Sequence, residues 1–194
     1  MYRIQQWILG VVLMLSIGTA QALDTGRIQL ENFLRDVHTL EARFEQTVID
    51  AENVQQGLAS GVFLLKRPNL FRWDYLIPEK RAIIADGKTV WLVENDLQQI
   101  TQYSQRMALK NTPAAILLSG DKPLEDSFIF TEQGESQGMQ WLALQPRDTE
   151  SDTLEILLAF KDNQLQQLAL VDKFGQLTRF SLHHMQYNVA LADD

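Results

Sequence analysis

The sequence contains no cysteine among its 194 residues. This absence excludes disulfide-stapled folds, thiol nucleophiles and thiolate metal sites. The protein must therefore be stabilised by an ordinary hydrophobic core, and its length is sufficient for one domain. Bacterial proteins that carry a lipid anchor bear it on a cysteine just after the signal sequence, so we also expect no membrane anchor of that kind.

Basic residues are scarce. The 17 Lys and Arg residues are outnumbered by 25 Asp and Glu residues, and the formal net charge is −8. Nucleic acids and anionic membrane surfaces both require clustered basic side chains, so we expect neither as a partner. Two explanations of the acidic balance stay open, namely solubility alone and association with a basic partner.

Signatures of catalysis and of metal binding are also missing. The sequence has no G-x-S-x-G, G-x-G-x-x-G, P-loop or H-E-x-x-H motif, and it has only three histidines. His38 lies beside an apolar helical stripe. His183 and His184 are neighbours on a predicted strand, so their side chains point to opposite faces and cannot chelate one ion together. We expect no catalytic residue, no metal and no cofactor, and therefore no enzyme.

The longest apolar run lies at the N-terminus and is too short to span a membrane comfortably. Arg3 precedes the run at residues 7–17, and Ala20-Gln21-Ala22 has the small-x-small pattern of a cleavage site. We predict a cleaved signal peptide over residues 1–22 and a single exported domain over residues 23–194. The alternative is a membrane anchor that is retained.

Apolar residues recur at helical spacing near the start of this domain. The stripe consists of Leu30, Phe33, Leu34, Val37 and Leu40. It predicts an amphipathic helix over about residues 26–40. A second, short helix is predicted over residues 112–120, because Thr112 is a favourable cap, Pro113 suits the first helical position, and residues 116–118 supply an apolar body.

Alternation of apolar and polar residues predicts eleven short strands, the first at residues 44–48. The others are predicted over residues 60–66, 70–76, 81–85, 89–94, 98–103, 128–133, 139–145, 154–161, 165–172 and 177–187. Turn signals separate most of them, at Asp86-Gly87, Asn95-Asp96, Gln133-Gly134, Asp162-Asn163 and Phe174-Gly175. The pattern predicts a mainly β (α+β) fold, in which an antiparallel sheet curls or closes and two helices cover it.

Aromatic residues concentrate on one face of the strand that follows Arg67-Pro68. Phe71, Trp73 and Tyr75 alternate, so a strand would direct all three to the same face, which needs an apolar cover. Further apolar residues on nearby strands are Phe63, Leu65 and Trp91. Two interpretations stay open, because these side chains could fill a core or could hold an apolar ligand between the sheet and its helices.

The stretch KRPNLFRWDY, at residues 66–75, resembles the signature region of the LolA family of outer-membrane lipoprotein carriers. The resemblance continues through P-E-x-x-x-I-I-A-D-G-K-T-V-W, which begins at Pro78, and residues 40–46 and 111–113 fit at similar spacing. It implies a periplasmic chaperone of Gram-negative bacteria. The implied fold is an unclosed antiparallel β-barrel whose hydrophobic concavity is covered by helices.

The resemblance also implies partners. The cargo would be triacylated lipoproteins, received from an inner-membrane lipoprotein-releasing ABC transporter and delivered to an outer-membrane lipoprotein receptor. That receptor shares the fold but is itself a lipoprotein, so the missing cysteine favours the carrier, and we expect a monomer. The alternative is a periplasmic lipid- or lipoprotein-binding sensor or regulator of the same fold that transfers nothing. One departure is that family members usually continue past residues 187–188 with a further apolar strand and a proline-containing tail.

Residue roles follow from the resemblance position by position. Arg67 matches an arginine that holds the helical lid through hydrogen bonds to backbone carbonyls. Phe71 matches an exposed apolar residue that contacts partner proteins, and Trp73 matches an aromatic residue at the cavity. The residues implied for the acyl-chain cavity and its lid are Leu30, Phe33, Leu34, Val37, Leu40, Phe44, Phe63, Leu65, Trp73, Trp91, Ile116 and Leu117.

Overall fold

The computed structural model describes residues 25–119 and 123–191, and the predicted signal peptide at residues 1–22 lies outside these ranges. The described chain forms one antiparallel sheet with short helices. The strands are β1 (Thr39–Ile49), β2 (Gln55–Lys66), β3 (Leu70–Ile77), β4 (Arg81–Asp86), β5 (Thr89–Glu94), β6 (Gln99–Ser104), β7 (Phe128–Ser136), β8 (Met139–Pro146), β9 (Thr153–Lys161), β10 (Gln164–Asp172) and β11 (Leu177–Tyr187). The helices are α1 (Gly26–Asp36), α2 (Gln105–Ala108), α3 (Pro113–Leu118) and the 3₁₀ helix η1 (Leu124–Asp126). None of the helices in these two ranges is long and apolar enough to cross a membrane.

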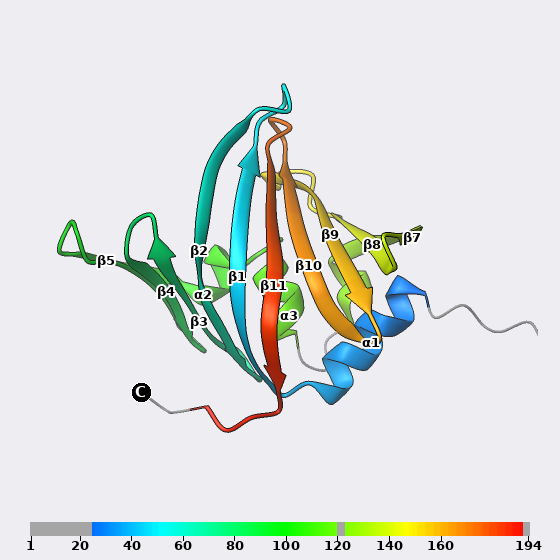
Figure 1. Ribbon diagram of the computed structural model, residues 1–194, viewed down its shortest axis with the longest axis horizontal. Coiled ribbons are helices and arrows are strands. Elements are labelled where there is room, and N and C mark those ends of the chain that lie inside the picture. Colours follow the sequence, from blue (N-terminus) through cyan, green and yellow to red (C-terminus); the bar gives the residue numbers. More distant parts are fainter. Residues whose placement is uncertain (1–24, 120–122, 192–194) are drawn as a thin grey trace, which may run out of the picture.

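The sheet is open. Its strands run in the order β6-β5-β4-β3-β2-β1-β11-β10-β9-β8-β7, every neighbouring pair is antiparallel, and β6 and β7 are the two edges. The chain leaves β6, forms α2, α3 and η1, and then enters β7. In Figure 1, α2 and α3 lie behind the curved sheet and α1 lies across the lower part of β9 and β10. The predicted unclosed barrel with helices over its concavity is confirmed.

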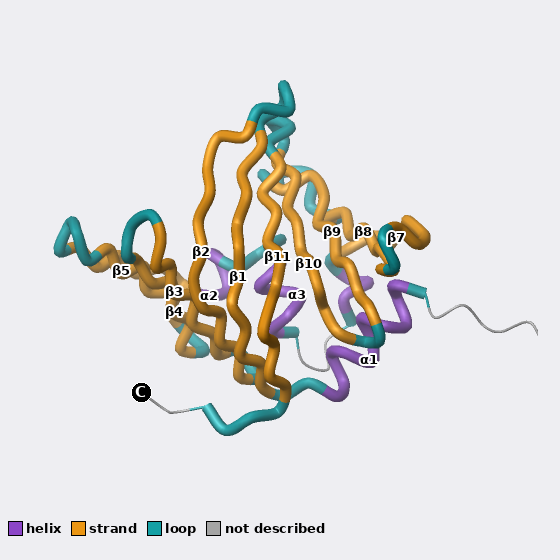
Figure 2. The backbone as a smooth tube through the Cα atoms, viewed as in Figure 1, coloured by secondary structure: helices purple, strands orange, loops and turns teal. Residues whose placement is uncertain are grey.

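The inner face of the sheet is apolar because side chains alternate along each strand. On β1, Leu40, Ala42 and Phe44 are buried, whereas Arg43 and Glu45 are exposed. Inward-facing residues of the other central strands and of α1 and α3 join them in one contiguous hydrophobic core. Figure 2 shows that the turn between β1 and β2 lies at the far end of the sheet from α1, so the helices cover only part of the concavity.

The first helix is shorter than predicted. It ends at Asp36 rather than near residue 40, because Val37 already has an extended backbone. The backbone N–H of His38 donates to Oδ1 of Asn188, 2.8 Å away, and this bond draws the chain toward the sheet. Leu40 therefore belongs to β1, and its apparent place in the helical stripe arose because the helical and strand patterns overlap there.

The turn predicted at residues 133–134 is wrong, because β7 continues through it to Ser136. The pairing of β7 with β8 shifts there as a β-bulge, and Gly134 has a φ of +76°, a conformation that glycine adopts without strain. The chain reverses instead at residues 137–138, where both residues have positive φ. A glycine between two strand-like runs marked a bulge rather than a turn.

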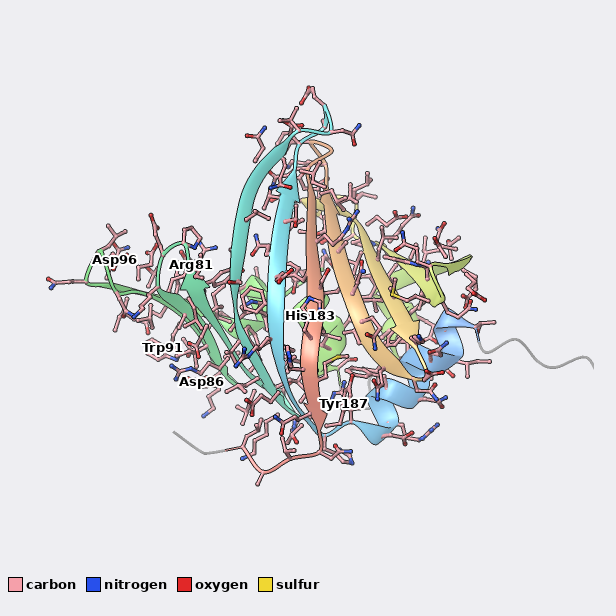
Figure 3. All side chains as sticks on the ribbon, viewed as in Figure 1. Arg81, Asp86, Trp91, Asp96, His183 and Tyr187 are labelled. Carbon is pink, nitrogen blue, oxygen red and sulfur yellow. The ribbon has the colours of Figure 1, made fainter. Side chains whose placement is uncertain are left out.

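The Asp86 carboxylate, in the hairpin between β4 and β5, should make the stability of the fold depend on pH. The Asp86 carboxylate accepts hydrogen bonds from the Trp91 indole (2.9 Å) and from the backbone N–H groups of Thr89 (2.7 Å) and Lys88 (2.8 Å). Figure 3 shows Asp86 and Trp91 beside each other. These bonds, that from Trp91 most strongly, lower the pKa of Asp86 to about 2 from an ordinary value of 3.8.

Because the pKa is depressed in the folded state, the stabilisation is present above about pH 4 and is lost as the pH falls through about 2. We expect Asp86→Ala to lower the urea midpoint at pH 7, and we expect its difference from the wild type to shrink between pH 4 and pH 2. The control is Asp96→Ala in the next turn. Equal effects of the two substitutions at pH 7 would contradict the assignment.

Candidate functional site

The centre of the concavity is a cluster of aromatic rings contributed by β1, β2, β3 and β11. The Trp73 ring centroid lies 4.6 Å from that of Phe63, 4.8 Å from that of Phe180 and 5.1 Å from that of Phe44. Their edge-on and tilted arrangements are those that aromatic pairs favour. Trp73 is only 7% exposed, so this apolar surface is closed to water in the structure.

Two helices cover this surface. From α1, Leu30 and Phe33 point into the core, and the Phe33 ring lies 6.0 Å from that of Phe160. From α3, Ile116 and Leu117 are both fully buried. The Thr112 hydroxyl caps α3 by accepting a hydrogen bond from the backbone N–H of Ala115. Together α1 and α3 form a lid whose underside is part of the core.

Arg67, in the turn between β2 and β3, holds both helices of the lid. Its Nε donates to the carbonyl oxygen of Leu117 in α3, at 2.8 Å. Its Nη1 donates to the carbonyl oxygens of Phe33 (3.2 Å), Leu34 (3.1 Å) and Val37 at the end of α1. Carbonyls at the end of a helix lack some of the backbone donors that carbonyls in its interior have, and Arg67 supplies donors to them. The Phe33 oxygen also accepts the backbone N–H of Val37, 3.1 Å away.

The Arg67 guanidinium has an unusual electrostatic environment. Within residues 25–119 and 123–191, no carboxylate forms an ion pair with it. It lies over the Phe33 ring, 5.1 Å from the centroid. Burial lowers the pKa of Arg67 to about 10 from 12.5, so the side chain stays cationic at neutral pH. A half-buried cation is thus balanced by carbonyl dipoles and by the face of an aromatic ring.

The N-terminal end of α1 is held by Glu132, a residue that the sequence analysis did not single out. The Glu132 carboxylate, on β7, accepts hydrogen bonds from the backbone N–H groups of Gly26 (3.0 Å) and Arg27 (2.9 Å) in the first turn. A negative charge is favourable at a helix N-terminus. These partners lie more than 100 positions apart, so no local pattern could have found them.

Most of the predicted cavity and lid residues do meet at this site. Buried in the common core are Leu30, Phe33, Val37, Leu40, Phe44, Phe63, Leu65, Trp73, Ile116 and Leu117. Leu34 is half-buried and packs against the same core. Leu40 contributes from the sheet rather than from the lid. The residues that sequence reasoning missed include Phe160 and Leu168, which face the lid from β9 and β10.

The expectation that Phe71 is exposed is wrong in this structure, whereas its contact with partner proteins stays a prediction. Phe71 is only 6% exposed and belongs to the core. It pairs with Leu65 on β2 and with Ala85 on β4. The alternation that places Trp73 and Tyr75 on the inner face places Phe71 there too.

The assignment of Trp91 to the cavity is also wrong. In the register of β4 with β5, Val90 lies opposite Ala85 and both are buried in the core. Its neighbour Trp91 therefore points to the outer face, opposite Ile84, where its indole N–H donates to Asp86. Hairpin register, rather than residue type, decides which side chain faces inward.

An open cavity of about 920 Å³ lies beside the lid. Pro68 and Asn69, which follow Arg67, line one side of it, and Ala115 and Leu118 of α3 contribute apolar wall. The start of β7 closes another side. The cavity thus reaches the lid next to the arginine that holds the lid in place.

The residues of the site favour apolar contacts rather than covalent or metal chemistry. In the described part of the chain, no group of three or more His, Asp or Glu side chains is placed to hold a metal ion. The concavity offers aromatic and aliphatic surface, a cover of the same character, and one cation that fastens the cover. In such a site, the apolar groups of another molecule can take the place of the side chains on the underside of the lid.

The chain is similar in sequence to a known family of proteins. Residues 35–194 match the sequence profile of the family described as "Outer membrane lipoprotein carrier protein LolA". The chain is 36% identical over 172 residues to an outer-membrane lipoprotein carrier protein of Methylococcus capsulatus, covering 89% of this chain and 82% of that protein. It is 37% identical over 163 residues to that of Chromobacterium violaceum, covering 84% and 78% respectively. Among solved structures, the LolA superfamily protein NE2245 from Nitrosomonas europaea aligns over 87% of this chain and 96% of that one, with a TM-score of 0.48 and 12% identity.

Proposed function

Because this chain belongs to the family of outer-membrane lipoprotein carriers, LolA, we propose that its concavity is the site that takes up the acyl chains of lipoproteins. The protein is a lipoprotein chaperone, and the relatives that are 34–37% identical to it over most of the chain are named outer-membrane lipoprotein carrier proteins. The observation that carries the proposal is an apolar concavity whose two covering helices are both held by the side chain of Arg67.

Cargo would enter by replacing the lid. Acyl chains would occupy the space that the apolar undersides of α1 and α3 fill in the closed form, against the rings of Phe44, Phe63 and Trp73. The displaced helices would lose the Arg67 hydrogen bonds and their core contacts. Uptake therefore exchanges one set of buried hydrocarbon for another, and no nucleotide or cofactor is needed.

The energetics explain why such a lid is useful. Burying acyl chains is favourable by about 0.8 kcal/mol per CH₂, so three long chains buried without cost would be held too tightly to leave. Reclosing the lid restores its burial and the bonds to Arg67, each about 1.5–3 kcal/mol for a charged donor. The closed form thus opposes cargo retention and lets cargo pass to a receptor that buries it better.

The compartment, the oligomeric state and the proteins that deliver and receive the cargo are also part of the proposal. We propose that the protein works in the periplasm after removal of residues 1–22, that it acts as a monomer, and that it catalyses no covalent step. Cargo would arrive from the inner-membrane lipoprotein-releasing ABC transporter and pass to the outer-membrane lipoprotein receptor. Support comes from the family membership and from the predicted signal sequence.

Native mass spectrometry of the protein purified from cells that make lipoproteins tests this function. We expect a 1:1 adduct with triacylated lipoprotein, and release of that adduct when the outer-membrane receptor is added. A folded protein with no adduct would contradict lipoprotein binding. An adduct that the receptor cannot release would favour a sensor over a carrier.

A further inference from the structure

Two buried N–H groups have no hydrogen-bond partner. They are Nη2 of Arg67 and Nε1 of Trp73, and they are the only such side-chain atoms in the described residues 25–119 and 123–191. A buried donor without an acceptor is unfavourable, so native proteins rarely leave one without a reason. Both belong to the proposed cargo site. Arg67 bonds to the two helices of the lid, and Trp73 lies in the aromatic cluster at the centre of the concavity.

Trp73 is surrounded by groups that cannot accept its proton. Its ring packs against Phe44, Phe63 and Phe180. The neighbouring inner-face polar pair is already satisfied, because the Tyr75 hydroxyl donates to Oε1 of Gln46 at 2.8 Å. The indole N–H of Trp73 is thus a hydrogen-bond donor in an otherwise apolar surface, and the surrounding side chains offer it no acceptor.

Arg67 shows which acceptor suits this site. Every hydrogen bond that it donates in the closed form goes to a carbonyl oxygen, and none goes to a carboxylate. When the lid leaves, these carbonyls leave with α1 and α3, and the guanidinium needs replacements. A ligand that brings neutral carbonyl oxygens would supply acceptors of the kind that the lid had provided.

Arg67 and Trp73 lie along one wall of the concavity. Arg67 follows the last residue of β2, and Trp73 lies on β3, opposite Phe63 of β2. The two donors are therefore separated along a single pair of strands, with the apolar residues Phe71 and Leu65 between them. An extended ligand that lies along this wall could meet both donors.

We infer that these two N–H groups are subsites for the ester and amide carbonyl oxygens that link acyl chains to the lipidated cysteine of the cargo. This inference rests on the proposed function. An anion is a poorer candidate, because desolvating a charge among the aromatic rings near Trp73 would be costly, whereas a neutral carbonyl is not. The cavity thereby selects acylated cargo over plain hydrocarbon of the same length.

The test compares two triacylated lipopeptides of equal chain length. One has natural ester and amide linkages, and in the other the two ester carbonyl groups are replaced by CH₂, which gives neutral ethers, while the amide is kept so that no cationic amine is introduced. We expect the wild-type protein to bind the ester-containing lipopeptide about tenfold more tightly, since two satisfied donors are gained. Trp73→Phe, which removes the N–H and keeps an aromatic ring, should reduce this preference to about threefold.

Trp91→Phe is the matched control, because the Trp91 indole lies on the outer face and donates to Asp86. It should keep the tenfold preference. A second measurement does not depend on a variant: the indole ¹H–¹⁵N resonance of Trp73 should shift downfield on binding the ester-containing lipopeptide and not on binding its ether analogue.

The outcomes separate the two proposals. Equal binding of both lipopeptides, with no distinct shift of the Trp73 indole resonance, would overturn the carbonyl subsites and leave lipoprotein binding intact. Failure of the wild-type protein to bind either lipopeptide would overturn the proposed function itself. A preference for free fatty acid over both lipopeptides, lost in Arg67→Leu, would assign Arg67 to a carboxylate and also overturn the subsites.

Discussion

Arg67→Leu should slow the handover of bound lipoprotein to the receptor by tenfold or more, while the protein stays folded and still takes up cargo. The substitution removes the Arg67 donors to the carbonyl oxygens of Leu117, Phe33 and Leu34 in the closed form, although the Phe33 oxygen still accepts the backbone N–H of Val37. Each such bond contributes about 1.5–3 kcal/mol when the donor is charged, and about 1.4 kcal/mol corresponds to a factor of ten. The open, loaded form is thereby favoured.

The measurement is the rate at which a fluorescent triacylated lipopeptide leaves the loaded protein for receptor-bearing vesicles. Arg43→Leu is the control, because Arg43 is exposed on the outer face of β1 and its loss removes the same charge without touching the lid. Arg67→Lys should be intermediate, since an ammonium keeps the charge but cannot span acceptors on two helices as a guanidinium does. Transfer at the wild-type rate by Arg67→Leu would show that the lid fastening does not govern release.

The net strength of this fastening is smaller than the number of its hydrogen bonds indicates. The guanidinium loses hydration when the lid closes, and no carboxylate in the described residues compensates it. Opening returns the cation to water, which offsets part of the cost of breaking the bonds. We therefore expect the closed form to be only moderately favoured over an open one.

Gly61→Ala should destabilise the fold by about 3 kcal/mol or more, at the upper end of what overpacking costs. A methyl group at Gly61 would lie 1.8 Å from the carbonyl oxygen of Asp74 and 2.9 Å from Cε1 of Phe44. The oxygen belongs to the backbone of β3 and cannot turn aside. Strands β2 and β3 approach closely here, where their register shifts between Ser60 and Gly61.

Urea unfolding of the two glycine variants of β2 makes the comparison direct. Gly57→Ala is the control, because no atom lies within 4 Å of a methyl group built there, and its midpoint should stay close to that of the wild type. Similar midpoints for Gly61→Ala and Gly57→Ala would mean that β2 and β3 are not packed as described. Loss of soluble Gly61→Ala, with normal yield of Gly57→Ala, would fit the expected severity.

Strand patterns were the most informative part of the sequence, since all eleven predicted strands are present. The errors occurred where two patterns overlapped or where a distant contact decided the outcome. Leu40 fits both the helical stripe and the strand alternation, and the bond from His38 to Asn188, 150 positions away, selects the strand. The residues near His38 in the sequence give no indication that Asn188 is its hydrogen-bond partner.

The site was predictable in composition but not in orientation. Apolar residues of the first helix and of β1 to β3 could be assigned to a common core, and the family resemblance pointed to Arg67. The side of the sheet that Trp91 faces depended on the register across Asp86-Gly87. The orphaned donors of Arg67 and Trp73 were beyond any sequence argument, because they follow from which acceptors the folded chain fails to supply.

A barrel that stays open lacks a fixed circumference, because no hydrogen bonds join its edge strands β6 and β7. Here the chain that runs from one edge to the other is the segment that carries α3. Lifting α3 would remove Ile116 and Leu117 from the core, to which strands of both halves of the sheet contribute. We therefore expect the sheet to widen when bulky cargo displaces α3, since no hydrogen bonds fix its circumference.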